Sequence, residues 1–103
     1  VKNNMPNELE VLVGEANSKL FLEEGNPSKS TVKLFQEILN KDENNPLALL
    51  ILGDNELKEN NLLNAKNLYL SLLNLLKKDS KEYTEINNKI NSIEERLNEE
   101  KER

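Results

Sequence analysis

The sequence contains neither cysteine nor histidine. Without a thiol or an imidazole, the chain has no thiolate nucleophile, no imidazole general base and no His or Cys metal ligand. We therefore expect neither a metal site nor a cofactor. The missing cysteine leaves the redox compartment open, because an oxidising compartment permits disulfides without requiring them.

Aromatic residues and long apolar runs are also scarce. Hydrophobic residues make up 36% of the 103 residues and aromatic residues only 4%, which predicts one domain with a modest core of Leu and Ile. No apolar run approaches the roughly 20 residues that cross a bilayer, and no signal peptide is found. From the first residue, Val1, we expect a processed chain or an excised domain whose membrane anchor lies outside it.

Positive charge is in deficit. The formal net charge is -5, charged residues make up 32% of the chain, and the mean hydropathy is -0.73. Surfaces that bind nucleic acid or anionic membranes neutralise phosphates with Lys and Arg, and no basic stripe is present here. We therefore expect a protein or peptide partner, with no nucleic acid and no direct membrane insertion.

Apolar residues recur at helical spacing in five segments, which predicts a single all-α domain of about five antiparallel helices over residues 1–103. Asn7 is the expected cap of the first helix, Gly25 its end, and Asn26-Pro27 the start of the second. Asp79 or Ser80 is expected to cap the last helix. The predicted units are a hairpin over 7–41 with helices 7–24 and 26–41, a hairpin over 46–77 with helices 46–59 and 61–76, and a final helix over 80–101.

The second hairpin carries the strongest pattern in the chain. Leu49, Leu52 and Gly53 fall on one helical face, and Ala65, Tyr69 and Leu72 on another. A glycine inside a helix costs about 1 kcal/mol relative to alanine, so it usually marks a close approach of another backbone. We expect that close contact at Gly53 and Ala65. The same arrangement occurs 34 residues earlier, where Thr31, Phe35, Ile38 and Leu39 precede Ala65, Tyr69, Leu72 and Leu73.

The first and last helices each allow two interpretations. In the first, Val11 and Leu22 lie almost opposite the main apolar stripe, so this second side is either core or ligand-facing. The last helix carries one stripe on an otherwise polar surface, which suits either a cap on a helical stack or a coiled-coil dimer. The cap is favoured because fewer than about three heptads are present. Residues 98–103 are expected to fray.

With its 34-residue period, the pattern of Leu49, Leu52-Gly53, Ala65 and Tyr69 resembles a tetratricopeptide (TPR) pair. The first unit is degenerate, because Thr31 replaces the usual small alanine. The chain departs from the family pattern at two further positions, with Glu56 where an aromatic residue is usual and Lys77 where a closing proline is usual. The resemblance implies an α-α superhelix of two hairpins closed by the last helix.

A narrower resemblance spans residues from about 9 to 90. The order and spacing of several blocks are similar to the periplasmic TPR domain of cytochrome c maturation proteins, the haem-lyase accessory subunits; the blocks are Gly25 to Ser30, Lys33 to Leu39, Asp42 to Leu49, Leu52-Gly53, Tyr69 to Leu73 and Asp79-Ser80. This resemblance implies capture of the C-terminal segment of an apocytochrome c, or of a cytochrome nitrite reductase, before haem attachment. It also implies a location on the periplasmic side of a bacterial inner membrane; otherwise we expect a cytoplasmic protein.

Stacked helix pairs curve, and the first helix of each pair lines the inner surface. An apolar floor with charged edges there suits an amphipathic helix or an extended tail. Leu50 and Leu57 also fit simple burial under the last helix, whereas Asp54 and Lys58 need water or a partner. The residues predicted to line the groove are Glu15, Lys19, Leu22, Leu47, Leu50, Asp54, Leu57 and Lys58.

An enzyme is the competing class, and we do not favour it. Adjacent carboxylates such as Glu23 and Glu24, or Glu94 and Glu95, point about 100° apart on a helix and do not converge on one substrate atom. The sequence has no Gly-rich phosphate loop and no nucleophile elbow. We expect no catalytic residues. A structural or oligomerisation role through the last helix remains a third class, although a monomer is the expected state.

Overall fold

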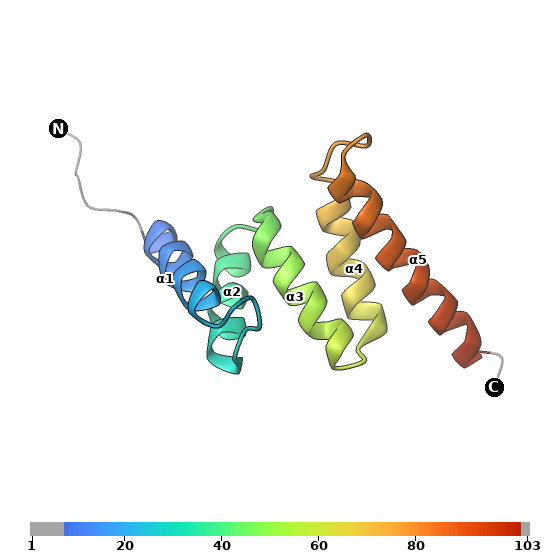
Figure 1. The fold of residues 1–103 in the computed structure, drawn as a ribbon, viewed down its shortest axis with the longest axis horizontal. Coiled ribbons are helices and arrows are strands. Elements are labelled where there is room, and N and C mark those ends of the chain that lie inside the picture. Colours follow the sequence, from blue (N-terminus) through green and yellow to red (C-terminus); the bar gives the residue numbers. More distant parts are fainter. Residues whose placement is uncertain (1–7, 102–103) are drawn as a thin grey trace.

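The computed structural model describes residues 8–101, and this part of the chain is all-helical. The five helices found there run alternately up and down as the chain crosses the molecule (Figure 1). Their bounds are Glu8–Leu22 for α1, Lys29–Lys41 for α2, Pro46–Lys58 for α3, Leu62–Leu73 for α4 and Lys81–Lys101 for α5. The predicted all-α fold of about five helices is confirmed.

The starts of α2, α3 and α5 follow from capping side chains. Ser28 accepts a hydrogen bond from the Thr31 amide at the start of α2, so this helix begins two residues later than the predicted Asn26-Pro27 signal. Asn45 caps α3 ahead of Pro46, and the Ser80 hydroxyl accepts from the Tyr83 amide at the start of α5. The predicted cap Asn7 lies outside the described residues.

Three helices end before the predicted residue. α1 ends at Leu22 rather than at residue 24, and α3 ends at Lys58 rather than at residue 59. α4 ends at Leu73 rather than at Leu76, because the amides of Leu75 and Leu76 bond to carbonyls only three residues back, which tightens the last turn. α5 ends at Lys101, as predicted, although its residues from 98 onward were expected to fray. The charge of this segment therefore does not end the helix.

Each helix packs against the helix before it and the helix after it in the sequence. Across the described part of the chain no close backbone contact joins α1 to α3 or α3 to α5. Figure 1 shows the resulting row of helices from α1 at one end to α5 at the other. The arrangement is therefore an open stack rather than a closed bundle.

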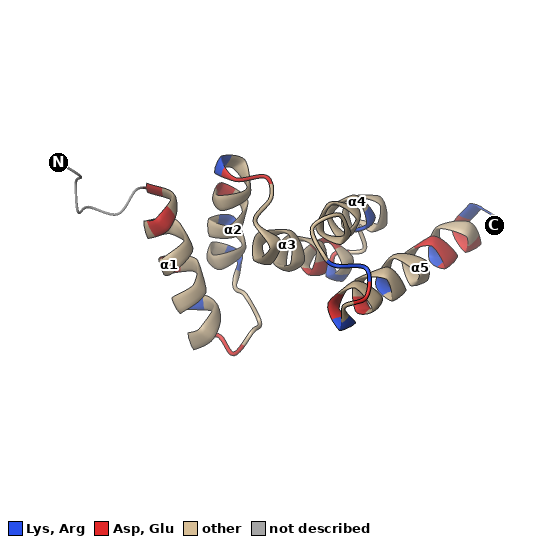
Figure 2. Cartoon of the chain, turned by 90° about the horizontal axis from the view of Figure 1, so that it is seen from above, with Lys and Arg blue, Asp and Glu red and all other residues tan. Residues whose placement is uncertain are grey.

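The buried residues form two clusters that meet at α3. Phe35 and Ile38 of α2 join Ala16 of α1 in the first cluster, and residues of α4 and α5 around Tyr69 form the second. α3 contributes Ala48, Ile51 and Leu52 to the first cluster and Leu49 to the second. This central helix is apolar on two sides because both sides are buried, and it carries charge only in its second half (Figure 2).

The structure decides between the two interpretations given for the first helix and between the two given for the last helix. Val11 is 52% exposed and Leu22 is 78% exposed, so the second apolar side of α1 is not core within the described structure. On α5, Ile86, Ile90 and Ile93 are buried in the cluster formed with α4. The stripe on α5 is thus used to close the stack, and the opposite face of the helix is exposed.

Candidate functional site

A groove of about 750 Å³ opens on one side of the second hairpin, where α3 and α5 flank α4. Its floor is apolar and its edges are polar. Because α3 and α5 are not in close backbone contact, the space between them is lined by side chains rather than closed by helix packing. The apolar lining residues are Pro46, Leu47, Leu50, Leu72, Leu76 and Ile86, and the polar ones are Asp54, Glu82, Glu85, Asn88 and Lys89.

A polar cluster joins the three helices at this groove. The Tyr69 hydroxyl of α4 donates a hydrogen bond to the Asp54 carboxylate of α3. The Lys89 amine of α5 lies 3.0 Å from the same carboxylate oxygen and 5.5 Å from the centre of the Tyr69 ring. Asp54 and Lys89 keep 44% and 40% of their side chains exposed, so the cluster reaches from the core to the surface of the groove.

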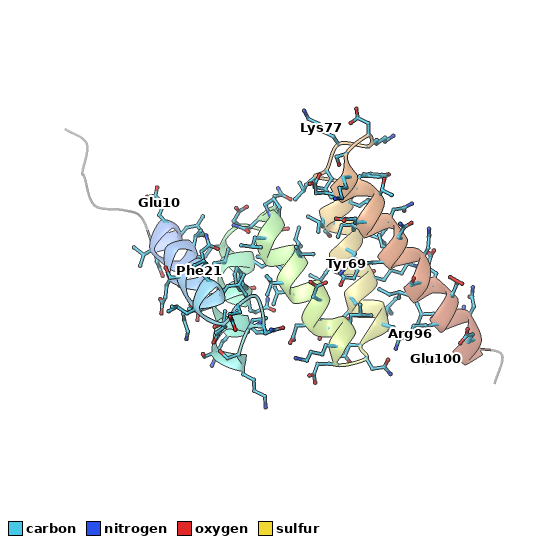
Figure 3. The ribbon with its side chains drawn as sticks, viewed as in Figure 1. Glu10, Phe21, Tyr69, Lys77, Arg96 and Glu100 are labelled. Carbon is cyan, nitrogen blue, oxygen red and sulfur yellow. The ribbon has the colours of Figure 1, made fainter. Side chains whose placement is uncertain are left out.

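Tyr69 itself is completely buried, and Figure 3 places it in the interior of the second half of the molecule. Burial raises the pKa of its hydroxyl, and the neighbouring Asp54 carboxylate raises it further, so the phenol remains a hydrogen-bond donor. A side chain at Gly53 has no room, because its Cβ would lie 2.6 Å from Cε1 of Tyr69. The three atoms nearest to that Cβ all belong to Tyr69, so the glycine accommodates this ring, whereas the sequence had pointed to Ala65.

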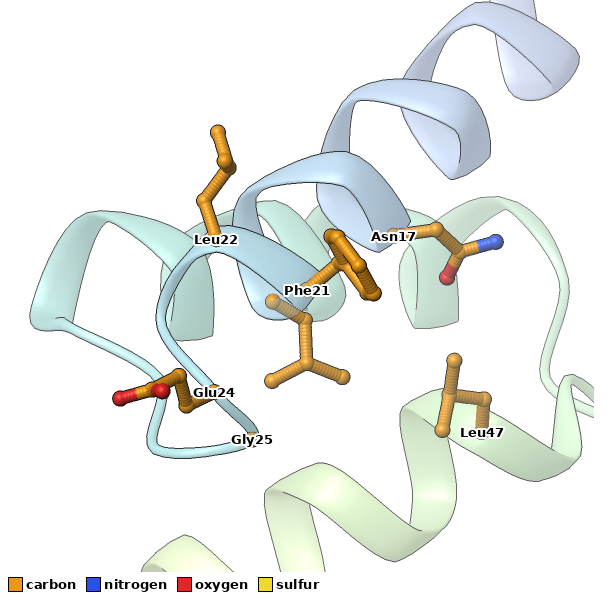
Figure 4. A pocket seen from close by; sticks show the side chains of 7 residues that line it. Asn17, Phe21, Leu22, Glu24, Gly25 and Leu47 are labelled. Atoms are coloured by element: carbon orange, nitrogen blue, oxygen red, sulfur yellow. The ribbon is translucent and has the colours of Figure 1, made fainter.

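A second, shallower pocket lies between the end of α1 and the start of α3. Asn17 and Phe21 of α1 and Leu47 of α3 border the same space in Figure 4. Phe21 is 82% exposed, and Leu22 also lines this pocket. Leu47 lines both this second pocket and the groove.

The predicted groove residues of α3 separate into two sets. Leu47, Leu50 and Asp54 line the groove. Leu57 instead packs against the core cluster shared with α4 and α5, so for this residue simple burial is the better interpretation. Lys58 faces the start of α2, where it lines two small pockets with Pro27, because α3 turns it away from α5.

Of the predicted α1 residues, only Leu22 lines a pocket on this side of the molecule. The Lys19 amine donates a hydrogen bond of 2.9 Å to the Ser30 hydroxyl, which ties α1 to α2, and Glu15 is exposed outside both pockets. The prediction placed the inner face of α1 at a constant number of residues before the inner face of α3. However, six residues connect α1 to α2, and only three connect α3 to α4. The inner face of α1 is consequently displaced along the sequence.

The sequence missed the α1 residues that face the second pocket, Asn17, Leu20 and Phe21, for this reason. The difference in length between the two connections was the signal that could have found them. It also missed Glu82, Glu85 and Lys89, because the stripe on α5 indicates only which side of that helix is buried. The six residues predicted as structural repeat positions are all buried, namely Leu49, Leu52, Gly53, Ala65, Tyr69 and Leu72.

Over residues 8–101, no helix is both long and apolar enough to span a membrane, and no cluster of acidic residues has the geometry of a metal site. The chain matched no family model, no curated protein and no solved structure.

Proposed function

We propose that this chain is a TPR-like module that binds a peptide segment of another protein in the groove between α3 and α5. The observation that carries the proposal is the groove itself, which combines an apolar floor from three helices with polar edges and opens to solvent. Apolar floors accept the anchoring side chains of a partner, and polar edges orient it. A groove between packed helices needs no catalytic group for this role.

The 34-residue period supports the TPR assignment. Phe35 and Tyr69 are both buried, and so are Thr31 and Ala65, the second pair of matching positions. Ile38 and Leu72, the third pair, are buried as well. Residues one period apart are therefore buried in both hairpins, which is expected for stacked repeats that present their first helices on one surface.

The resemblance to cytochrome c maturation proteins suggests a specific peptide. In this more detailed form of the proposal, the groove holds the C-terminal segment of an apocytochrome c on the periplasmic side of the membrane. The Leu-lined floor suits the apolar face of such a segment. The same floor also suits a peptide from an unrelated partner, so the two forms of the proposal must be tested separately.

Fluorescence anisotropy with labelled peptides tests the proposal. The probes are 20-residue synthetic peptides from the C-termini of the host's c-type apocytochromes, together with a designed amphipathic peptide whose apolar face carries Leu. We expect saturable binding that Leu50→Asp weakens at least about tenfold, because a carboxylate is placed on the apolar floor. Leu63→Asp on α4 is the matched control, since Leu63 is 60% exposed and lies outside the groove.

The outcomes distinguish the two forms. Binding of the designed peptide but of no apocytochrome peptide contradicts the maturation role and leaves the peptide-binding role in place. If no probe binds, or if Leu63→Asp weakens binding as much as Leu50→Asp, the groove is not the site. Sedimentation velocity over a range of protein concentrations tests the oligomerisation alternative, because a dimer formed through α5 changes its sedimentation coefficient with concentration.

A further inference from the structure

The charges around the groove have a strong bias of sign. Asp54, Glu82 and Glu85 line its edges, and Lys89 is the one basic residue among the described lining residues. The Lys89 amine is already paired with Asp54 at 3.0 Å. Glu24 lines the separate second pocket beside α1, so a carboxylate is found there too. The open edge is therefore acidic.

The carboxylates of Glu82 and Glu85 form no ion pair within the described residues. Both residues are exposed on α5. The ion pairs found over residues 8–101 join Lys41 to Glu8, Lys66 to Glu94 and Lys89 to Asp54, and none of them includes Glu82 or Glu85. These two carboxylates stand beside an apolar floor and are free to pair with cations of a ligand.

Nearby basic residues face other directions. The Lys58 side chain lines pockets beside α2, and the Lys19 amine is bonded to Ser30. Lys77 belongs to the connection between α4 and α5, where Figure 3 labels it, and it does not line the groove. Lys78, in the same connection, and Lys81, the first residue of α5, do not line the groove either. The acidic edge is thus not balanced from an adjacent element.

We infer that the occupant of the groove is a cationic amphipathic segment, with apolar side chains on the Leu floor and Lys or Arg side chains against Glu82 and Glu85. This inference rests on the proposed function and narrows its ligand. Complementary charge steers the approach of such a segment and fixes its orientation, and like charge disfavours acidic competitors. The interaction lies at an exposed edge, so it weakens as salt is added.

Three designed peptides test the inference. They share one apolar Leu face and differ only at the flanking positions, which carry Lys, Gln or Glu. At low ionic strength we expect the Lys peptide to bind about tenfold tighter than the Gln peptide and the Glu peptide to bind weakest, because several exposed pairs contribute together. The preference for Lys should shrink in about 0.5 M salt, where the Debye length falls below about 5 Å.

Variants of the protein locate the effect. Glu82→Lys with Glu85→Lys should reverse the preference in favour of the Glu peptide. Glu82 lies in the first turn of α5, where negative charge stabilises a helix, so the milder pair Glu82→Gln with Glu85→Gln is the second variant. That pair should remove the preference without reversing it. Glu95→Lys with Glu99→Lys, exposed on the same helix and outside the groove, is the matched control and should keep the preference.

The failure of this inference can be told apart from the failure of the proposed function. If the Lys, Gln and Glu peptides bind equally well, the groove binds peptides but does not select cations, and the inference is wrong. It is also wrong if the control pair Glu95→Lys, Glu99→Lys changes the preference as much as the groove pair does. If none of the three peptides binds at any salt concentration, both the proposed function and the inference are wrong.

Discussion

The two helical hairpins place an aromatic residue at the same point of the 34-residue period and surround it differently. Phe35 of the first hairpin lies in a wholly apolar cluster with Ala16 and with residues of α3. Tyr69 of the second hairpin packs against Gly53 and bonds through its hydroxyl to Asp54, which also binds Lys89. The first aromatic residue serves only packing, whereas the second also connects three helices through polar groups.

The small residue that accompanies each aromatic ring also differs between the two hairpins. Gly53 lies 16 residues before Tyr69, and Ala16 lies 19 residues before Phe35, a shift of three that equals the extra length of the connection between α1 and α2. Ala16 is completely buried. One hairpin therefore combines Ala with Phe, and the other combines Gly with a Tyr whose hydroxyl reaches the edge of the groove. The polar cluster of Tyr69, Asp54 and Lys89 therefore occurs in the hairpin that borders the groove.

The largest effect should come from removing the rings. Tyr69→Ala is expected to lower the free energy of unfolding by about 3 to 5 kcal/mol, because it empties a fully buried site that Gly53 cannot refill. Phe35→Ala should cost about 1 kcal/mol less, since no hydrogen bond is lost. Urea unfolding followed by circular dichroism measures both. Equal costs would mean that the polar cluster adds nothing to the packing of Tyr69.

The two small residues should respond in the same direction for opposite reasons. Gly53→Ala is expected to destabilise the protein by about 1 to 3 kcal/mol, because the added Cβ collides with the Tyr69 ring. Ala16→Gly should cost about 1 kcal/mol through the poorer helix propensity of glycine. Thermal unfolding of the two variants gives the comparison. A stabilising Gly53→Ala, as helix propensity alone predicts, would show that the ring has room to move.

The tyrosine hydroxyl should have a smaller effect than its ring. Tyr69→Phe keeps the packing and removes the hydrogen bond to Asp54, which is expected to cost about 1 to 2 kcal/mol because the acceptor is charged. Tyr83→Phe is the matched control, since Tyr83 is only half-buried and its hydroxyl makes no hydrogen bond in the described structure. Its cost should stay within about 0.5 kcal/mol. Similar losses in the two variants would remove the distinction between the hairpins.

The smallest effect concerns the polar network of the first hairpin, which lies at its turn. Hydrogen bonds from Ser28 and Thr31 lower the pKa of Glu23 below its ordinary value of 4.5. The ionised form is thus favoured on folding, so this contribution to stability is present above pH 4.5 and is lost as the pH falls through the lowered value.

Urea unfolding at a series of pH values from neutral to acid should show this loss. Glu23→Gln should flatten the acid decline relative to the original chain. Glu99→Gln, an exposed site on α5, corrects for the general loss of one carboxylate. A decline that Glu23→Gln and Glu99→Gln alter equally would contradict the role given to Ser28 and Thr31.

Hydrophobic periodicity was sufficient to predict the helices and most of their starts. It succeeded for α3, where Asn45 and Pro46 form a local start signal. It also succeeded for Leu47 and Leu50, because helical spacing within α3 places both on the face that lines the groove. It failed at α1, because a fixed offset ignores the length of the intervening connection. Local patterns carry spacing within a helix but not the rotation of one helix relative to another.

The polar cluster was beyond sequence reasoning for a different reason. Asp54 was predicted to need water or a partner, and its partners Tyr69 and Lys89 come from later helices, 15 and 35 residues away. Nothing in the local pattern around Lys89 distinguishes it from a solvated lysine, because its position follows from how α5 crosses α4. Such contacts appear only once the packing is known.

α3 supplies side chains to both buried clusters, so it acts as a common wall between the two halves of the stack. Unfolding of either half alone would expose one buried face of α3, with its leucine and isoleucine side chains, to water. The cooperative unit is therefore the whole stack, and heat should melt it in a single transition. A ligand bound in the groove at α3 would therefore raise the free energy of unfolding of the whole stack, including the first hairpin, which it does not contact.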